Sequence, residues 1–318
     1  MAVKTIGVAA MGGDSKAVIQ RIEDFEKIGI PAAWLTTGGA GLDGLTLFGA
    51  AAVNTTDIKL GTCITPTWPR HPITTVQQVQ VLEGLAPGRF RLGVGPSHRP
   101  SIEQTYGFDF RTPLTNLREY LQIVTKLLKD GSVEFDGDHY HAHASIAEAM
   151  PNVPVMASAL RPGSFRTCGE LADGAISWVC PEEYLRDVAM PAMEEGAKLA
   201  NRTVPAMVVH TPVCVHDDPT EVYFSAREQL GNYPRLPFYA KMFAAAGYPE
   251  ALDNQQWSDR MINAVVFSGT ERQVEDRIRS LFDWGVSEII VTVVTAGSDR
   301  SKSTQRTLET LAGIASRL

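Results

Sequence analysis

The sequence predicts an α/β protein of the (β/α)8 type, a TIM barrel that forms a single domain over residues 1–318. The first observation is that eight short apolar runs alternate with segments of helical periodicity, as a parallel barrel requires. The second is length, because α/β barrels reach 318 residues as one domain. The third is the first turn, AAMGGDSKA, which lacks the G-x-G-x-x-G spacing of the alternative, an open dinucleotide-binding sheet.

Each predicted strand is a short apolar run bounded by turn-forming residues. Such runs are typical of parallel strands that are buried on both faces. The eight runs are Thr5–Ala10, Ala32–Thr36, Ile58–Thr65, Phe90–Gly95, Val153–Ala157, Gly174–Val179, Ala206–Val215 and Val286–Val294.

Three of the intervening helices begin with recognisable capping signals. Asp14 is a predicted N-cap for the first helix. Thr112 stands directly before a proline, which favours an N-cap followed by proline at the first helical position. Thr270 and Gln273 have the spacing of a capping box and predict the start of the last-but-one helix.

Two insertions interrupt the alternation of strands and helices, at residues 132–152 and 231–268. The first contains VEFDGDHYHAH, which predicts a hairpin with its turn near Asp136 and Gly137. The second is rich in aromatic residues. Insertions that follow barrel strands lie on the catalytic face, so we expect both insertions after strands at the C-terminal face of the barrel, and the second to form a lid. Its aromatic side chains either line a pocket for a bulky, weakly polar substrate or pack the lid onto the barrel.

Histidines alternate along the predicted hairpin, at His139, His141 and His143. This spacing can bind a metal, but a polar, solvent-facing strand explains it as well, and no Cys or carboxylate cluster with ligand spacing accompanies it. We therefore expect no metal site. The four cysteines are widely separated and form no C-x-x-C pair, which favours a reducing compartment: Cys63, Cys168, Cys180 and Cys214.

Composition limits the partners and the location. The chain has 36 acidic and 29 basic residues, a net charge of −7, and no Lys/Arg run that could follow a phosphate backbone, so we expect no nucleic-acid partner. No uncharged apolar stretch reaches the roughly 18 residues of a membrane span, and the start of the chain does not look like a signal peptide. We expect a cytoplasmic protein without membrane contact.

The stretch TPTWPRHP follows the third predicted strand, so it lies at the C-terminal rim of the barrel, where this fold builds its active sites. Its three prolines, Pro66, Pro69 and Pro72, stiffen that rim.

Four motifs appear in a characteristic order along the chain. They are GTCITPTWPRHP (61–72), LAPGRFRLGVGPS (85–97), VPVMASALRPGSFRTCGELADGAISWV (153–179) and SGTERQVEDRIRSLFDWGVSEIIV (268–291). Together they resemble the luciferase-like monooxygenase family, and specifically its branch of oxidoreductases that use the deazaflavin coenzyme F420. The resemblance covers almost the whole chain.

The resemblance implies several site residues. The third strand of that branch ends in a non-prolyl cis peptide that supports the cofactor ring, and here it would join Cys63 to Ile64. The segment from Val153 to Val179 is similar to the family's phosphate-binding segment. The resemblance and the residue types together predict the following cofactor-binding residues: Thr37, Cys63, Ile64, Thr65, Gly95, Ser97, Ala157, Ala159, Leu160, Arg161, Gly163 and Trp178.

The residues themselves support the phosphate site. Ala157, Ser158 and Ala159 are small enough for a ligand to approach the backbone, and Gly163 lies in the first turn of a predicted helix whose N–H groups favour an anion. Arg161 adds a positive charge. An ordinary strand-to-helix turn is the alternative. Elsewhere on the rim, Trp68 and Trp178 are candidates to flank an aromatic ring, whereas Trp34 is expected to pack in the barrel.

Two positions depart from the family's sugar-phosphate-oxidising members. Those proteins end the second strand in an Asp–His pair, where this chain has Thr37 and Gly38. They also carry a Glu after the fourth strand, where this chain has His98. Since histidine titrates near neutral pH, His98 is the candidate catalytic residue that exchanges the proton accompanying hydride transfer, the alternative being a solvated rim histidine.

The leading hypothesis is therefore a coenzyme F420-dependent oxidoreductase that transfers a hydride between the deazaflavin and a small organic substrate. The first alternative is a flavin mononucleotide (FMN) monooxygenase of the same family, which would consume oxygen. The second is a flavin-binding barrel without turnover, motivated by the missing Asp–His pair. Relatives in the family are often dimers, so the resemblance also implies a homodimer, although no stretch of the sequence identifies an interface.

Overall fold

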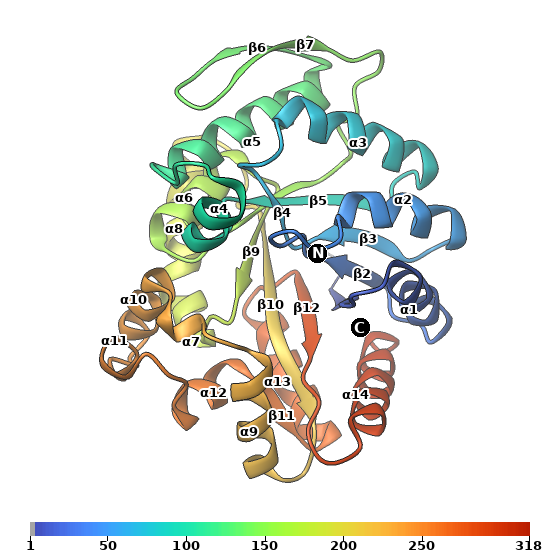
Figure 1. The fold of residues 1–318 in the computed structure, drawn as a ribbon, viewed down its shortest axis with the longest axis vertical. Coiled ribbons are helices and arrows are strands. Elements are labelled where there is room, and N and C mark those ends of the chain that lie inside the picture. Colours follow the sequence, from blue (N-terminus) through green and yellow to red (C-terminus); the bar gives the residue numbers. More distant parts are fainter. Residues whose placement is uncertain (1–3) are drawn as a thin grey trace.

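The computed structural model describes residues 4–318 and contains a closed barrel of eight parallel strands (Figure 1). The strands follow one another around the barrel in chain order, and the ring closes because the seventh pairs with both the sixth and the eighth, which in turn pairs with the first. The predicted fold class is therefore confirmed. The barrel strands are β1 (Thr5–Ala9), β2 (Ala32–Leu35), β3 (Lys59–Thr62), β5 (Phe90–Gly95), β8 (Val155–Ser158), β9 (Gly174–Trp178), β10 (Ala206–Val215) and β12 (Glu288–Val293).

All eight predicted runs coincide with barrel strands. Seven of them agree with the observed bounds to within two residues at each end, and the third strand ends three residues earlier than predicted. β3 ends at Thr62, and the chain re-enters the sheet as β4 (Thr65–Pro66), which pairs with the end of β5. The peptide bond between Cys63 and Ile64, at the break between β3 and β4, is cis, at the position that the family resemblance implied.

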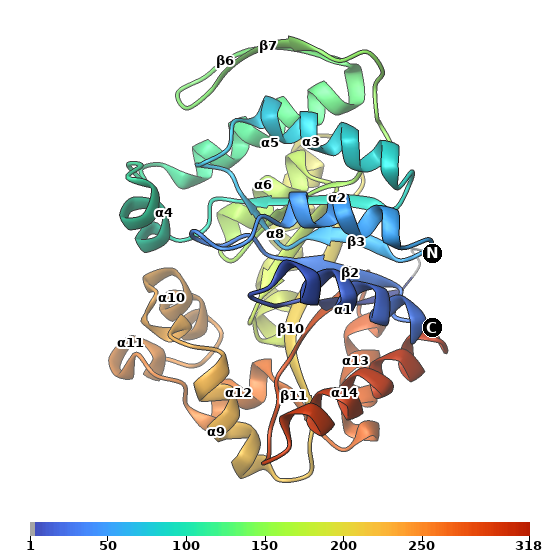
Figure 2. The same cartoon turned by 45° about the vertical axis from the view of Figure 1, so that its right-hand side comes forward.

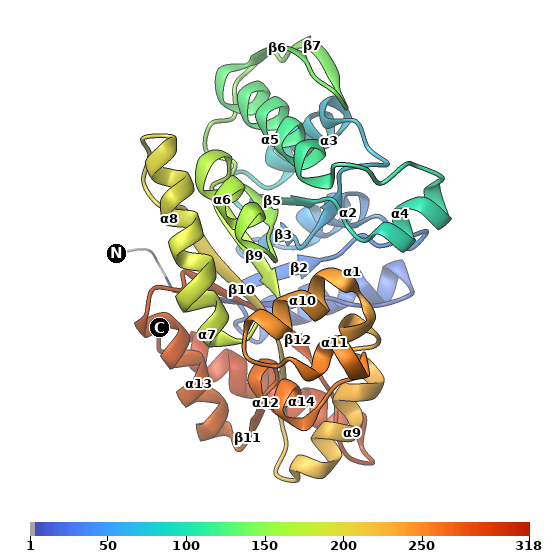
Figure 3. The ribbon, with the colours of Figure 1, turned by 90° about the vertical axis from the view of Figure 1, so that its left-hand side faces the viewer.

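Helices surround the barrel, as Figure 3 shows from a second side. They are α1 (Ser15–Lys27), α2 (Gly44–Asn54), α3 (Pro72–Leu85), α4 (Arg99–Tyr106), α5 (Pro113–Asp130), α6 (Pro162–Leu171), α7 (Glu182–Tyr184), α8 (Met190–Leu199), α9 (Pro219–Gln229), α10 (Pro237–Ala245), α11 (Glu250–Asn254), α12 (Asp259–Val265), α13 (Glu271–Asp283) and α14 (Arg300–Ala315). Within residues 4–318, no helix is both long enough and apolar enough to cross a membrane.

Two of the three predicted caps form as expected. The Asp14 side chain accepts a hydrogen bond from the N–H of Lys16, and Thr270 forms the reciprocal capping box with Gln273. Thr112 does occupy the N-cap position of α5, but its side chain makes no capping bond. Its hydroxyl instead lies 2.9 Å from Nε2 of His139 in the hairpin, a partner that the sequence order does not reveal.

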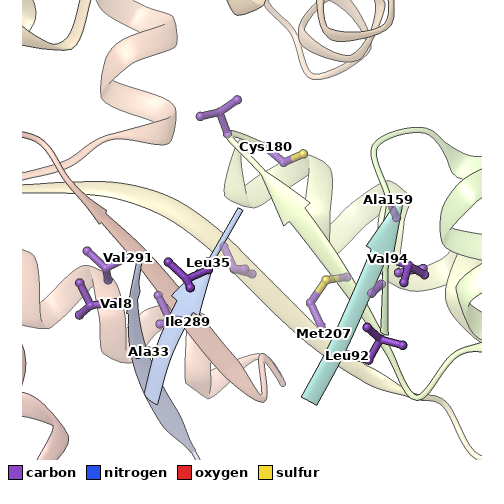
Figure 4. Packing of buried hydrophobic residues seen from close by; sticks show 14 of the residues in the cluster. Val8, Ala33, Leu35, Leu92, Val94, Ala159, Cys180, Met207, Ile289 and Val291 are labelled. Atoms are coloured by element: carbon purple, nitrogen blue, oxygen red, sulfur yellow. The ribbon is translucent and has the colours of Figure 1, made fainter. Parts of the chain in front are cut away.

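The buried apolar side chains of the barrel fall into two clusters, because successive strand side chains point to opposite faces. The outer set packs against the helices, and Figure 4 shows several of its members, including Val8, Leu35, Val94 and Val291. The inner set fills the barrel and comprises Ala32, Trp34, Cys63, Met156, Ile176, Val208 and Ile290.

A buried polar cluster occupies the barrel interior around Trp34. A methyl group on Gly7 or on Gly61 would come within 2.4 or 2.5 Å of the indole, so these two glycines make room for it. The indole Nε1 donates to the Glu288 carboxylate at 3.0 Å, and the Arg91 guanidinium lies 4.4 Å from the ring centroid. Arg91 and Glu288 form an ion pair with side chains only 10 and 6% exposed. Trp34 is therefore a barrel-packing residue, as expected.

The hairpin strands β6 (Ser132–Asp136) and β7 (His141–Ser145) pair antiparallel, and the predicted hairpin is confirmed. Its position differs from the expected one, because the hairpin follows helix α5 and not a barrel strand. It runs outside α5 and α3 (Figures 1 and 2). Its far end returns to the rim, where the Tyr140 hydroxyl donates to the Thr67 carbonyl at 3.0 Å.

Acidic side chains from the opposite strand accompany the hairpin histidines, which the sequence analysis did not foresee. Nδ1 of His141 lies 2.8 Å from Asp136, and His143 contacts both Asp136 and Glu134. These side chains are largely exposed. Across residues 4–318, no group of three or more His, Cys, Asp or Glu side chains is arranged to hold a metal ion.

The second insertion lies between α9 and α13. It contains a 3-10 turn at Tyr233–Arg235 and helices α10 to α12, and it leads into a short strand, β11 (Phe267–Gly269), which pairs with the C-terminal end of β10. This pairing holds the insertion at the C-terminal side of the barrel. Figure 2 shows α10 and α11 on the same side of the molecule as α4, opposite the carboxyl terminus.

Candidate cofactor and active site

The ends of β3, β5 and β8 meet closely at the C-terminal side of the barrel. A methyl group on Gly95 would lie 2.1 Å from Oγ of Ser158 and 3.1 Å from Cγ1 of Ile64. Gly95 therefore lets Ser158 of β8 and Ile64, just after β3, approach its backbone closely, and the cis peptide lies at one edge of this contact. We call Ile64, Gly95 and Ser158 the cradle.

Gly95→Ala should close the cradle. Its new methyl group meets Ser158 and Ile64, so we expect about 1–3 kcal/mol lower stability and a clear loss of cofactor affinity. Urea unfolding and a cofactor titration measure the two effects. Adding Ser158→Gly should restore part of the affinity. Gly84→Ala, in helix α3 with open space around it, is the matched control, and a Gly95→Ala protein that behaves like this control would contradict the prediction.

Two polar atoms close to the cradle in sequence are buried without a hydrogen-bond partner. One is Oγ1 of Thr65, in β4, and the other is Nη1 of Arg161, at the start of α6. Buried polar atoms without partners are rare in folded proteins, and they mark positions where a ligand atom or water is expected. A hydroxyl beside the cis peptide and a guanidinium at a helix N-terminus fit a ligand with a polar ring and an anionic tail.

The segment that precedes α6 has fewer free backbone N–H groups for an anion than the sequence suggested. The Ser164 hydroxyl accepts hydrogen bonds from the backbone N–H groups of Leu160 and Arg161, so neither N–H is free for an anion. Ala157 and Ala159 belong to the outer cluster, and Ser158 is the side chain that lies against Gly95. What remains for an anion is the Arg161 side chain together with the first turn of α6, in which Gly163 lies.

Threonines from the end of β2 fix the backbone at the cis peptide. Oγ1 of Thr36 donates to the Cys63 carbonyl at 2.7 Å, and the Thr37 N–H donates to the Ile64 carbonyl at 3.1 Å. The Thr37 hydroxyl accepts from the Gly44 N–H at 2.9 Å. Thr37 thus lies beside the predicted ring site, but part of its hydrogen-bonding capacity serves the start of α2. Burial raises the pKa of the Cys63 thiol to about 12, so this group stays protonated.

His98 lies directly after a backbone kink that follows β5. Ser97 has φ of 60°, a left-handed conformation that is uncommon for residues other than glycine and is frequent at functional sites. The His98 ring lies 5.9 Å from the ring of Tyr233 and 5.8 Å from that of Tyr239, between ring centroids. Burial lowers the pKa of His98 below its usual 6.5, so the imidazole is neutral at pH 7.

Tyr233, from the first turn of the insertion, connects the predicted residues across the mouth. Its ring centroid lies 5.7 Å from Trp178 and 4.8 Å from Tyr239. Other aromatic residues of the insertion serve packing, since Phe243 and Trp257 are buried with ring centroids 5.4 Å apart. The structure therefore brings His98 and Trp178 together through a tyrosine whose position the sequence could not give.

The two rim tryptophans have different ring neighbours. Trp68 contacts Phe110 and His139, on the side of α5 and the hairpin. Trp178 contacts Tyr233 and also His210 of β10, at 4.3 Å between centroids. Sequence reasoning missed His210. The sequence does contain a signal for this residue. His210 interrupts the apolar run AMVVHTPVCV, and because it lies two residues after the interior residue Val208 it shares the same face of the strand.

The family model described as luciferase-like monooxygenase matches residues 5–288. The chain belongs to the luciferase-like monooxygenase family. The resemblance that the four sequence motifs indicated is thus confirmed.

Within this family, the chain is similar to curated enzymes from archaea and bacteria. It is 27% identical over 241 residues to the 5,10-methylenetetrahydromethanopterin reductase of Methanopyrus kandleri, covering 70% of this chain and 68% of that protein. It is 28% identical over 270 residues to the F420-dependent glucose-6-phosphate dehydrogenase of Beutenbergia cavernae, covering 81 and 79%. Among solved structures, an F420-dependent secondary alcohol dehydrogenase in complex with an F420-acetone adduct superimposes with a TM-score of 0.82 at 17% identity, covering 98% of this chain and 99% of that one. This last likeness shows the shared fold.

Proposed function

We propose that this member of the luciferase-like monooxygenase family is a coenzyme F420-dependent oxidoreductase, in which His98 accepts the proton released when an organic substrate gives up a hydride. The observation that carries the proposal is the position of His98, half-buried at the barrel mouth and facing the insertion tyrosines. Relatives named as F420-dependent enzymes support the choice of cofactor.

The residues at the mouth suit the deazaflavin. The cradle and the Thr65 hydroxyl would hold the ring, and Arg161 with the first turn of α6 would hold the anionic tail. When bound, the deazaflavin supplies a carbon that takes up or gives a hydride in a two-electron step. The protein holds the reactants in position, since orientation alone lowers the barrier substantially.

His98 is suited to the role of a base because it is neutral at pH 7. A neutral imidazole can accept a proton, for example from a hydroxyl group, as the adjacent carbon is oxidised. Burial also raises the pKa of Tyr233 above 10 and that of Tyr239 well above 10, so both tyrosines stay protonated. The mouth therefore combines one proton acceptor with aromatic walls, which favours an uncharged, weakly polar substrate.

A side-by-side titration tests the cofactor. We expect the purified protein to bind coenzyme F420 at least tenfold more tightly than FMN, measured by cofactor fluorescence and by calorimetry. Reduced F420 should then react with a suitable electron-poor acceptor at the same rate with and without oxygen. Preferential binding of FMN with oxygen uptake in step with substrate would identify a monooxygenase instead, and binding of neither cofactor would contradict the site.

Arg161→Met tests the tail site. Losing a charge-assisted hydrogen bond to an anion should weaken F420 binding about 10- to 100-fold. The matched control is Arg166→Met, in the same helix, where the side chain is exposed and pairs with Glu195 at 3.2 Å. We expect the control to bind F420 like the unmodified protein. Equal affinities for the two variants would show that the tail does not reach Arg161.

A further inference from the structure

A hydrogen-bonded histidine lies inside the barrel behind Trp178 and has no part in the chemistry proposed above. Nε2 of His210, on β10, lies 2.7 Å from Oγ1 of Thr292, on β12. The imidazole also contacts the Trp178 indole, at 4.3 Å between centroids. Thr292, His210 and Trp178 thus form a chain of contacts across three neighbouring strands, β12, β10 and β9.

His210 is suited to holding a neighbour and not to exchanging protons. Its side chain is 7% exposed, and burial lowers its pKa to about 3, so it is neutral throughout the physiological range. A neutral imidazole with one nitrogen fixed by Thr292 has a defined ring orientation. Because the indole packs against that ring, the orientation of His210 sets the space available to Trp178.

The backbone at Trp178 is also fixed. The next residue, Val179, has φ of 45°, a conformation that is rare for a β-branched residue, and its N–H donates to the His210 carbonyl at 3.3 Å. Trp178 also borders the mouth of the barrel, since its ring contacts that of Tyr233, which in turn contacts that of His98. Trp178 therefore separates the His210 pair from the site of the proposed reaction.

We infer that Thr292 and His210 are positioning residues, which hold the Trp178 indole as a wall of the cofactor and substrate site. The inference rests on the proposed function for the identity of the cofactor. Neither residue touches the reacting atoms, and both act through Trp178.

The test is a double-mutant cycle between Thr292→Val and Trp178→Phe, with the affinity for F420 as the first readout. Thr292→Val should weaken F420 binding about fivefold or more, and Thr292→Ser, which keeps the hydroxyl, should restore it. In the Trp178→Phe background, Thr292→Val should change the affinity less than twofold. An F420 affinity unchanged by Thr292→Val, or an equal loss in both backgrounds, would overturn the inference.

The second readout is tryptophan emission in the absence of cofactor. From the spectrum of each protein we subtract that of the same protein carrying Trp178→Phe, so that the difference spectrum reports on Trp178. Thr292→Val should shift this difference spectrum, and Thr292→Ser should not. The matched control is Thr211→Val, which removes a buried hydroxyl that donates to the Val265 carbonyl, also at 2.7 Å, and should leave both readouts unchanged. If the unmodified protein fails to bind F420, the proposed function fails, while an unshifted spectrum in Thr292→Val overturns the positioning role independently.

Discussion

Replacing His98 by asparagine should lower kcat for substrate oxidation by about 10²- to 10⁴-fold, because the variant lacks the group that accepts the proton. The affinity for F420 should change little, since His98 is not among the residues proposed to hold the cofactor. The measurement is steady-state and single-turnover reduction of F420, once a substrate has been found. The matched control is His141→Asn, an exposed hairpin histidine that should retain full activity.

The pH dependence of the same reaction separates a base from an acid. The pKa of His98 is lowered by burial, so the rate should be constant at neutral pH and fall only below about 6.5, as the imidazole becomes protonated. This acid limb should disappear in His98→Asn. A rate that increases toward low pH would instead show that His98 donates a proton, and would reverse the direction of hydride transfer proposed here.

Replacing Arg91 by methionine should lower the free energy of unfolding by about 3–5 kcal/mol. The substitution leaves the Glu288 carboxylate buried without its cationic partner, and uncompensated buried charges are strongly destabilising. The Trp34 indole still donates to that carboxylate, but a neutral donor cannot replace a full charge. Urea unfolding monitored by circular dichroism measures the change as a lower midpoint with an unchanged slope.

Two controls accompany this prediction. The double variant Arg91→Met with Glu288→Gln removes the stranded charge, so it should recover most of the stability. Arg272→Met removes an exposed arginine 3.8 Å from Asp276 and should leave the midpoint unchanged, because exposed ion pairs contribute little. A midpoint for Arg91→Met equal to that of Arg272→Met would show that the interior pair does not stabilise the barrel.

Much of the fold could be predicted from the sequence because the relevant signals are local. Each barrel strand is a short apolar run, and each capping box or N-cap lies within a few residues of its helix. The hairpin followed from one turn signal. The hydroxyl of Thr112 was the exception, since its partner, His139, lies 27 residues away and outside the reach of capping rules.

The candidate site could be predicted only in part. Position relative to strand ends placed Ile64, Gly95 and His98 at the mouth, and the family motifs supported them. The small residues around Ser158 suggested that Ala157 and Ala159 bind the cofactor. Strand alternation instead turns both alanines outward and leaves Ser158 against Gly95. The assignment of Arg161 to an anion stays a prediction; in the structure its Nη1 is buried without a hydrogen-bond partner.

Local residue patterns are enough to show that this chain forms a parallel barrel, which strand ends carry polar residues, and which family it resembles. Which of the polar residues meet becomes evident only in the folded barrel. Arg91 and Glu288 are 197 residues apart, and His210 and Thr292 are 82 apart, yet each pair is joined by a hydrogen bond. The physical reason is that burial and hydrogen bonding across a closed barrel depend on the register between distant strands. That register arises when all eight strands close together, and no local pattern of residues contains it.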